Sequence, residues 1–285
     1  MKMENETKKS LKVLVRGAGD IASGIIWSLN YAGFKVCSTE VEKPSTIRTE
    51  VSFSSAIYDG KKVLDGVECV FCKEVPSMIY KCWEENKVPL VIDPEAKILN
   101  EIKFDVVIDS ILAKRNLGTK IDMAPLVIGV GPGFTAKVDC HIAIETMRGH
   151  NLARIIENGS PMKNTGIPGL IEGHSFDRVI HSPADGIIHN IHKIGDKVLK
   201  DEIIAKIDSP DGLASSSHCD VKATMDGILR GIIKDGYSVK KGLKIADIDP
   251  RLSEYENCFT ISDKARSIGG VVVVAIMHND EVYGK

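Results

Sequence analysis

The feature that most constrains this chain is a glycine-rich turn that follows a short apolar segment near its beginning. Residues 12–16 (KVLVR) have the composition of a buried strand, and residues 17–22 (GAGDIA) follow at once. The apolar residues of 21–32 then recur at three- and four-residue spacing, which predicts a helix. A strand, a Gly-x-Gly-x-x-Ala turn and a helix in this order predict a Rossmann-like nucleotide-binding unit.

The residues of this turn have separate expected roles. Gly17 permits the tight turn, Gly19 allows a phosphate to approach the backbone, and Ala22 allows close packing of helix on strand. The first helical residues, Asp20 and Ile21, would offer free N–H groups to the phosphates. Glu40 follows a second predicted strand and would bind a ribose hydroxyl, which favours NAD over NADP. The alternative is a glycine turn that binds another ligand or none.

Further short apolar runs extend this pattern along the chain. They lie at 67–71, 90–92, 106–108 and 126–128. Continuous apolar strands that alternate with helical stretches, such as 78–85, predict a parallel sheet covered on both faces. The apolar run 271–277 fits either a strand or a buried helix.

Two polar loops follow predicted strands in the middle of the chain. One is 109–116, and the other, 129–134, contains Gly131 and Gly133. Loops at the carboxyl ends of parallel strands line one crevice, so both are expected to face the Gly17 turn. The cationic side chains expected to bind phosphates are Lys114, Arg115, Arg148 and His150. The alternative is a solvated basic surface.

The other candidate chemical groups are weaker. His141 and Glu145 alternate with apolar residues as on a strand, where they would be too far apart to share a metal. Cys69 and Cys72 lie in an apolar run and would face opposite sides of a strand. Cys140 is adjacent to His141 but would also face away from it. We therefore expect no metal site and no catalytic cysteine.

An internal repeat marks the second half of the chain. Residues 181–207 align without gaps to residues 222–248, with matched glycines and isoleucines. Two copies facing each other can close a small β core. The pattern resembles the barrel-sandwich hybrid of biotinyl and lipoyl carrier domains. The connector 208–220 contains no lysine, so a docking or substrate-covering module is expected rather than a carrier.

The predicted fold class is therefore α/β, a Rossmann-like parallel sheet followed by a small all-β barrel-sandwich-hybrid-like module. The expected divisions are a tail at 1–10, the nucleotide-binding domain at 11–115 and its continuation, with the glycine-rich basic loops, at 116–178. The β module follows at 179–250, and 251–285 is expected to pack back on the α/β domain.

Charge and composition limit the expected partners and location. The formal net charge is −2, which gives no support for nucleic-acid binding. The polar first residues lack a signal-peptide pattern, no apolar run reaches the length of a membrane span, and the seven cysteines are scattered. These features favour a cytoplasmic protein without a membrane partner. They leave open whether the chain forms a homo-oligomer.

Several motifs together resemble a known family. They are 17–22 (GAGDIA), 124–134 (APLVIGVGPGF), 144–150 (IETMRGH), 164–169 (NTGIPG) and 247–251 (DIDPR). These segments look like the YqeB-type accessory proteins of selenium-dependent molybdenum hydroxylases. The resemblance implies a maturation factor with a hydroxylase client, but no catalytic residues. Lys137 and Cys140 depart from the small or aliphatic residues expected at these positions.

The leading hypothesis is thus an accessory protein for maturation of a selenium-dependent molybdenum hydroxylase. It would bind a nucleotide-containing ligand, either NAD or the dinucleotide form of the molybdenum cofactor. One alternative is an NAD-dependent oxidoreductase acting on a small metabolite, with His141 or His150 as acid or base. Another is a non-catalytic scaffold that docks the hydroxylase.

Overall fold

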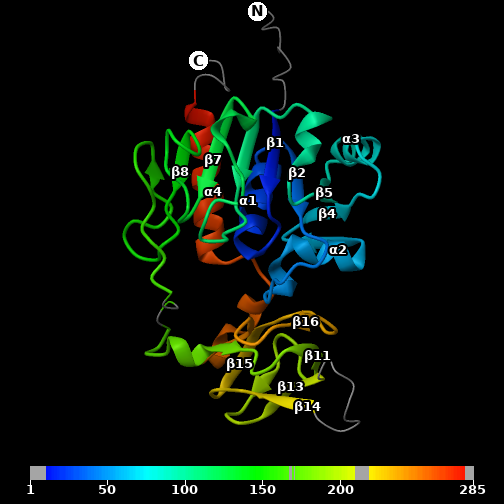
Figure 1. The fold of residues 1–285 in the computed structure, drawn as a ribbon, viewed down its shortest axis with the longest axis vertical. Coiled ribbons are helices and arrows are strands. Elements are labelled where there is room, and N and C mark those ends of the chain that lie inside the picture. The colour runs from blue at the N-terminus through cyan, green and yellow to red at the C-terminus, as the bar shows by residue number, and fades with distance from the viewer. Residues whose placement is uncertain (1–10, 167–168, 170, 209–217, 280–285) are drawn as a thin grey trace, which may run out of the picture.

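The computed structural model describes residues 11–166, 169, 171–208 and 218–279. It consists of an upper part built on a nine-stranded sheet and a lower part built on two four-stranded sheets (Figure 1). The tail 1–10 and most of the connector 208–220 lie outside the described residues. None of the described helices is long and apolar enough to cross a bilayer.

The large sheet has the strand order β3-β4-β5-β2-β1-β6-β7-β8-β9. In chain order its strands are β1 (Lys12–Arg16), β2 (Lys35–Glu40), β3 (Lys61–Leu64), β4 (Val67–Phe71), β5 (Val88–Ile92), β6 (Val106–Asp109), β7 (Leu126–Val130), β8 (Ile142–Ile144) and β9 (Ile155–Ile156). Neighbours from β4 to β8 run parallel. The edge pairs β3–β4 and β8–β9 run antiparallel.

Helices cover the two faces of this sheet unequally. Helix α1 (Asp20–Tyr31) and helix α4 (Asp263–His278) pack together on one face, and α3 (Ser77–Glu84) covers the other. The short α2 (Ala56–Asp59) lies near β3 and β4. Because successive strand residues face opposite ways, Val13 and Val15 join the core under α1 while Leu14 joins the core under α3. Cys69 and Cys72 divide between the same two cores, as predicted.

The lower part contains the repeat as two interlocked sheets. Its strands are β10 (Val179–His181), β11 (Gly186–Asn190), β12 (Lys197–Val198), β13 (Ile203–Asp208), β14 (His218–Lys222), β15 (Gly227–Ile232), β16 (Ser238–Val239) and β17 (Lys244–Asp249). The short β12 of the first copy pairs with β15 of the second, and β16 of the second pairs with β11 of the first. Each copy therefore contributes to both sheets, and one hydrophobic core lies within them.

The predicted fold class, a Rossmann-like parallel sheet followed by a barrel-sandwich-hybrid-like module, is wrong. The large sheet is mixed, with an antiparallel pair at each edge, and the lower part consists of two four-stranded antiparallel sheets. One cause is the Asp65-Gly66 turn between β3 and β4, where both residues have positive φ. Such a two-residue turn forms a hairpin, which a pattern of apolar runs does not reveal.

Candidate functional site

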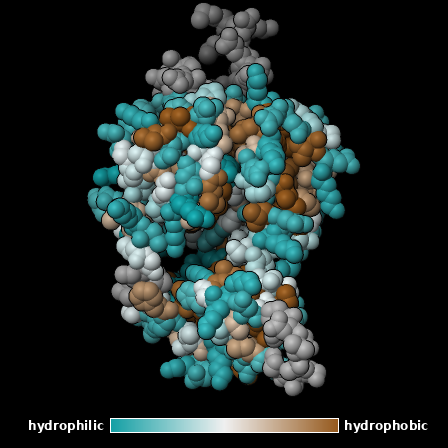
Figure 2. Space-filling model, viewed as in Figure 1, coloured by the Kyte–Doolittle hydropathy of each residue, from teal (hydrophilic) through white to brown (hydrophobic). Residues whose placement is uncertain are grey.

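The main cavity of the described structure lies between the upper and lower parts and has a volume of about 940 Å³. Figure 2 shows it as a hollow with hydrophilic residues around it. The first turn of α1 contributes Asp20 and Ile21 to its lining, and the start of α4 with the residues just before it contributes residues 260–264. The free N–H groups and the partial positive charge of a helix start favour an anion at such a place.

Cationic side chains from both parts dominate the wall of this cavity. Eight of them face six carboxylates. The cations are Arg48, Arg148, Arg178, Arg230, Lys244, Arg251, Lys264 and Arg266, and the carboxylates are Asp20, Glu172, Asp247, Asp249, Glu254 and Asp263. Guanidinium groups in a concave site are the groups that proteins use most often to bind phosphate.

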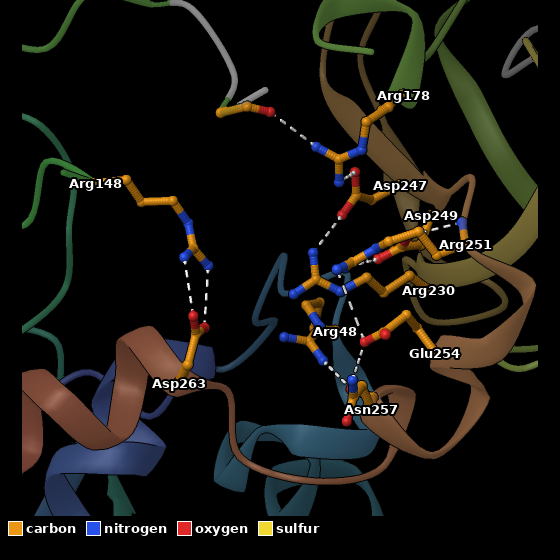
Figure 3. Close-up of polar contacts among 11 residues, drawn as sticks. Arg48, Arg148, Arg178, Arg230, Asp247, Asp249, Arg251, Glu254, Asn257 and Asp263 are labelled. Atoms are coloured by element: carbon orange, nitrogen blue, oxygen red, sulfur yellow. Dashed lines mark hydrogen bonds and ion pairs between the residues drawn. The ribbon is translucent and has the colours of Figure 1, made fainter. Parts of the chain in front are cut away.

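Ion pairs order the arginines of the wall (Figure 3). Asp247 accepts from Arg178 at 3.1 Å and lies 3.5 Å from Arg230. Arg251 lies 2.8 Å from Asp249. The pair of Arg148 and Asp263, at 3.2 Å, lies across an open space from the other arginines.

Arg48 joins the two parts at the floor of the cavity. Its guanidinium is 3.2 Å from Asp20 at the start of α1 and donates to the carbonyl of Asn257 at 2.9 Å. Only 6% of its side chain is exposed. The arginine therefore holds the upper and lower walls at a fixed separation.

Unsatisfied polar atoms surround the same space. Nε of Arg48, Nε of Arg178 and Oδ1 of Asp20 are buried without a hydrogen-bond partner among the described residues. A buried polar atom without a partner costs about 1–3 kcal/mol. All three residues line the cavity, so its wall carries buried polar atoms that a water or another polar group would satisfy.

Burial and crowding of like charges shift the pKa values of the cations. Burial lowers the pKa of Arg230, and the neighbouring Arg48 lowers it further. The pKa of Lys264 is lowered by desolvation and by Arg148. Desolvation by the cavity walls also lowers the pKa of Lys244, even though much of its surface remains exposed. An added anion would offset each of these shifts, because it favours the charged form.

The structure brings only some of the sequence-predicted binding residues to this cavity. Asp20, Ile21 and Arg148 line it. The residues absent from its lining are Gly17, Gly19, Ala22, Glu40, Lys114, Arg115, Gly131, Gly133 and His150. Lys114, Arg115 and His150 are exposed.

The glycine turn is closed by the protein itself. A Cβ on Gly17 would lie 3.1 Å from the backbone of Ile111, and the N–H of Ala18 donates to Glu40 at 3.0 Å. Glu40 also accepts from the N–H of Val41 at 2.8 Å, and burial raises its pKa. Its carboxylate is therefore engaged with the turn that was expected to receive a ribose.

The strand-end crevice beside this turn is filled by a buried arginine. Arg16, 1% exposed, donates to Asp109, Thr119 and the carbonyl of Pro94. The second glycine loop packs just as closely, since a Cβ on Gly133 would lie 2.6 Å from Cα of Arg115. These glycines permit close loop packing, and the open cavity lies instead beyond the start of α1.

The other chemical groups singled out in the sequence, His141 and Cys140, have contacts typical of a structural role. Nδ1 of His141 accepts from the N–H of Val127 at 3.0 Å. The thiol of Cys140 is buried, and burial raises its pKa to about 11. No group of three or more His, Cys, Asp or Glu residues within the described part of the chain is arranged to hold a metal ion.

Sequence reasoning missed most of the cavity wall, although the repeat contained a signal. Arg230 and Lys244 occupy positions at which the first copy has His189 and Ile203. Asp247 and Asp249 are 5% and 2% exposed, which is unusual for carboxylates. The cations Arg230 and Lys244, which break the repeat in the second copy, therefore mark the side that faces the cavity.

Comparison with known proteins gives one strong sequence match. No family model matches the chain. The chain is 46% identical to Uncharacterized protein YqeB of Escherichia coli strain K12 over 265 residues. This alignment covers 93% of the chain and 47% of YqeB. The chain thus spans about half the length of this relative.

The solved structures that it resembles are distant. One is the product-bound ectoine utilization protein EutE (DoeB) of Ruegeria pomeroyi, with 11% identity and a TM-score of 0.28 over 84% of this chain and 85% of that one. Another is a succinylglutamate desuccinylase/aspartoacylase of Rhodobacter sphaeroides, with 15% identity and a TM-score of 0.30 over the same shares. These likenesses carry no argument about chemistry. By sequence, 93% of this chain is similar to about half of YqeB.

Proposed function

We propose that this chain is an accessory protein in the maturation of a selenium-dependent molybdenum hydroxylase, and that it holds a nucleotide-bearing anionic ligand between its two parts. The pathway rests on the motifs shared with the YqeB-type proteins. The binding rests on one observation, the cavity with eight cationic side chains and two helix starts.

The residues of the cavity fit a phosphate-bearing ligand. Arg178, Arg230 and Arg48 would bind phosphate oxygens through guanidinium N–H groups. The first turn of α1, which has no side-chain cap, would add backbone N–H groups. The orphaned Nε atoms of Arg48 and Arg178 support this fit. The bound group would supply the molybdenum chemistry of the client enzyme, while this chain orients and shields its phosphates.

Of the two candidate ligands, the dinucleotide form of the molybdenum cofactor is favoured over NAD. Glu40, the expected partner of an NAD ribose, hydrogen-bonds to Ala18 and Val41 and does not line the cavity. The oxidoreductase alternative gains no support either, because His141 accepts a backbone hydrogen bond and His150 lies outside the lining.

Calorimetric titration of the purified protein with molybdopterin cytosine dinucleotide and with NAD tests the proposal. We expect the first to bind, with an affinity that falls as NaCl rises because salt screens the charges of an open site. Co-purification of a molybdenum hydroxylase with the tagged chain is the second readout. Absence of binding by both dinucleotides would overturn the ligand assignment, and absence of the hydroxylase would overturn the pathway.

A further inference from the structure

A second, smaller cavity of about 210 Å³ adjoins the first and differs from it in character. The two share Arg148, Gly169 and Lys264 in their linings. The remaining wall of the small cavity comes from Pro132, from residues 145–147, and from Met162, Asn164 and Thr165. It therefore offers methionine, proline, threonine and asparagine side chains where the main cavity offers arginines.

Glu145 fixes the shape of this small cavity. Its side chain is 3% exposed, and Oε1 accepts from the N–H groups of Thr146 and Met147 at 2.7 Å each. Oε2 accepts from the N–H of Met162 at 2.7 Å. Bonds to a carboxylate are about twice as strong as neutral ones. One buried carboxylate thus holds both methionine-bearing segments in place.

The glycine-containing loop 129–134 borders the small cavity on another side. Gly131 has a φ of +86°, and a Cβ there would lie 3.0 Å from Oγ1 of Thr146. Glycine therefore lets the loop carrying Pro132 pack against the end of β8. The glycine motif at 129–134 thus places Pro132 in one wall of the small cavity.

We propose that the small cavity binds the heterocyclic base of a nucleotide whose phosphates occupy the main cavity. The inference rests on the proposed function and names the ligand class as a nucleoside diphosphate or its dinucleotide conjugate. Methionine thioethers pack favourably against planar rings, and the amide of Asn164 carries both donors and acceptors for a base edge. Arg148 and Lys264, common to both cavities, would contact the phosphates at the junction.

Calorimetry with inorganic pyrophosphate and with CDP, UDP, ADP and GDP tests this inference. We expect at least one nucleoside diphosphate to bind roughly tenfold more tightly than pyrophosphate, the difference being the base contact. Met162→Ala should reduce that preference and leave pyrophosphate affinity unchanged. Met277→Ala is the matched control, because Met277 is similarly exposed on α4 and lines neither cavity.

Glu145→Gln tests the positioning role of Glu145. Its amide keeps the size of the side chain but weakens the carboxylate bonds to the two segments, so the preference for the nucleotide should fall while pyrophosphate still binds. The inference is wrong if pyrophosphate binds and every nucleoside diphosphate binds no more tightly, or if Met162→Ala weakens both ligands equally. If neither pyrophosphate nor any nucleotide binds, the proposed function fails as well.

Discussion

The lysines and arginines on the cavity wall differ in whether a carboxylate pairs with their charge. Arg48, Arg148 and Arg178 each form an ion pair with a carboxylate. The ammonium groups of Lys244 and Lys264 form no ion pair or hydrogen bond within the described residues. The lysines can therefore bind a ligand without giving up an existing partner, whereas each paired arginine would share its guanidinium between its carboxylate and the ligand.

Lys264 is expected to lower the stability of the free protein. It lies in the first turn of α4, where the helix dipole disfavours a cation, and desolvation together with Arg148 lowers its pKa, while Asp20, Glu145 and Asp263 raise it. Lys264→Gln should raise the free energy of unfolding by about 0.3–1 kcal/mol at pH 7. Chemical denaturation of both proteins measures the difference.

The stability effect of Lys264 should depend on pH. Because the pKa of Lys264 is lower in the folded chain than in the unfolded one, its unfavourable contribution is present at neutral pH and disappears as pH rises towards the unfolded pKa. The gain from Lys264→Gln should therefore shrink at alkaline pH. Lys222→Gln, an exposed site outside both cavities, should show no such gain. A gain that grew with pH would contradict the assignment.

Two glycines set the distance between helices α1 and α4. A Cβ on Gly269 would lie 2.4 Å from the carbonyl oxygen of Gly24, and a Cβ on Gly24 would lie 2.6 Å from the backbone of Ala265. The helices thus touch through their backbones near their first turns. This contact brings both helix starts to the same cavity.

Gly269→Ala should therefore destabilise the protein, by about 1–3 kcal/mol, because the added methyl forces the two backbones apart. Gly270→Ala is the matched control. It adds a methyl with no heavy atom within 4 Å and should stabilise α4 by roughly 0.5–1 kcal/mol, since alanine favours helix over glycine. Thermal unfolding of both variants measures the two changes in stability. Equal changes for Gly269→Ala and Gly270→Ala would contradict the close contact between the helices.

The sequence predicted individual helices and strands well, but it did not predict the antiparallel strand pairs at the edges of the large sheet. The strands at 12–16 and 67–71 have the predicted bounds, and the helix predicted at 21–32 is observed at Asp20–Tyr31. The run 271–277 fitted a strand equally well because of its valines. Its helical state follows from the N-cap of Ser262, whose side chain accepts from the N–H of Ala265, and from packing on α1.

The sequence predicted only those cavity residues that lie in or beside a recognisable local motif. Asp20 and Ile21 follow from the glycine turn, and Arg148 from the basic middle segment. Arg178, Arg230 and Lys244 come from the lower part, which a local pattern cannot orient relative to α1. The predicted phosphate role of Lys114 and Arg115 stays a prediction, and the loops that carry them pack on the glycine turns.

The segment 43–48 joins the two parts of the molecule. Tyr237 donates to the carbonyl of Lys43 at 3.2 Å, and a Cβ on Gly231 would lie 3.2 Å from the carbonyl oxygen of Ile47. Arg48 continues this contact into the cavity. The upper part supplies the helix starts, and both parts supply cationic side chains, so neither part alone forms the site.

The central claim is that this shared cavity binds a phosphate-bearing anion. The most direct measurement is calorimetric titration of inorganic pyrophosphate into the wild type, the Lys244→Met/Lys264→Met double variant and the Lys222→Met control. We expect wild type and control to bind equally and the double variant to bind at least about tenfold more weakly, from the loss of two charge-assisted contacts. Equal binding by all three proteins, or none by the wild type, would contradict it.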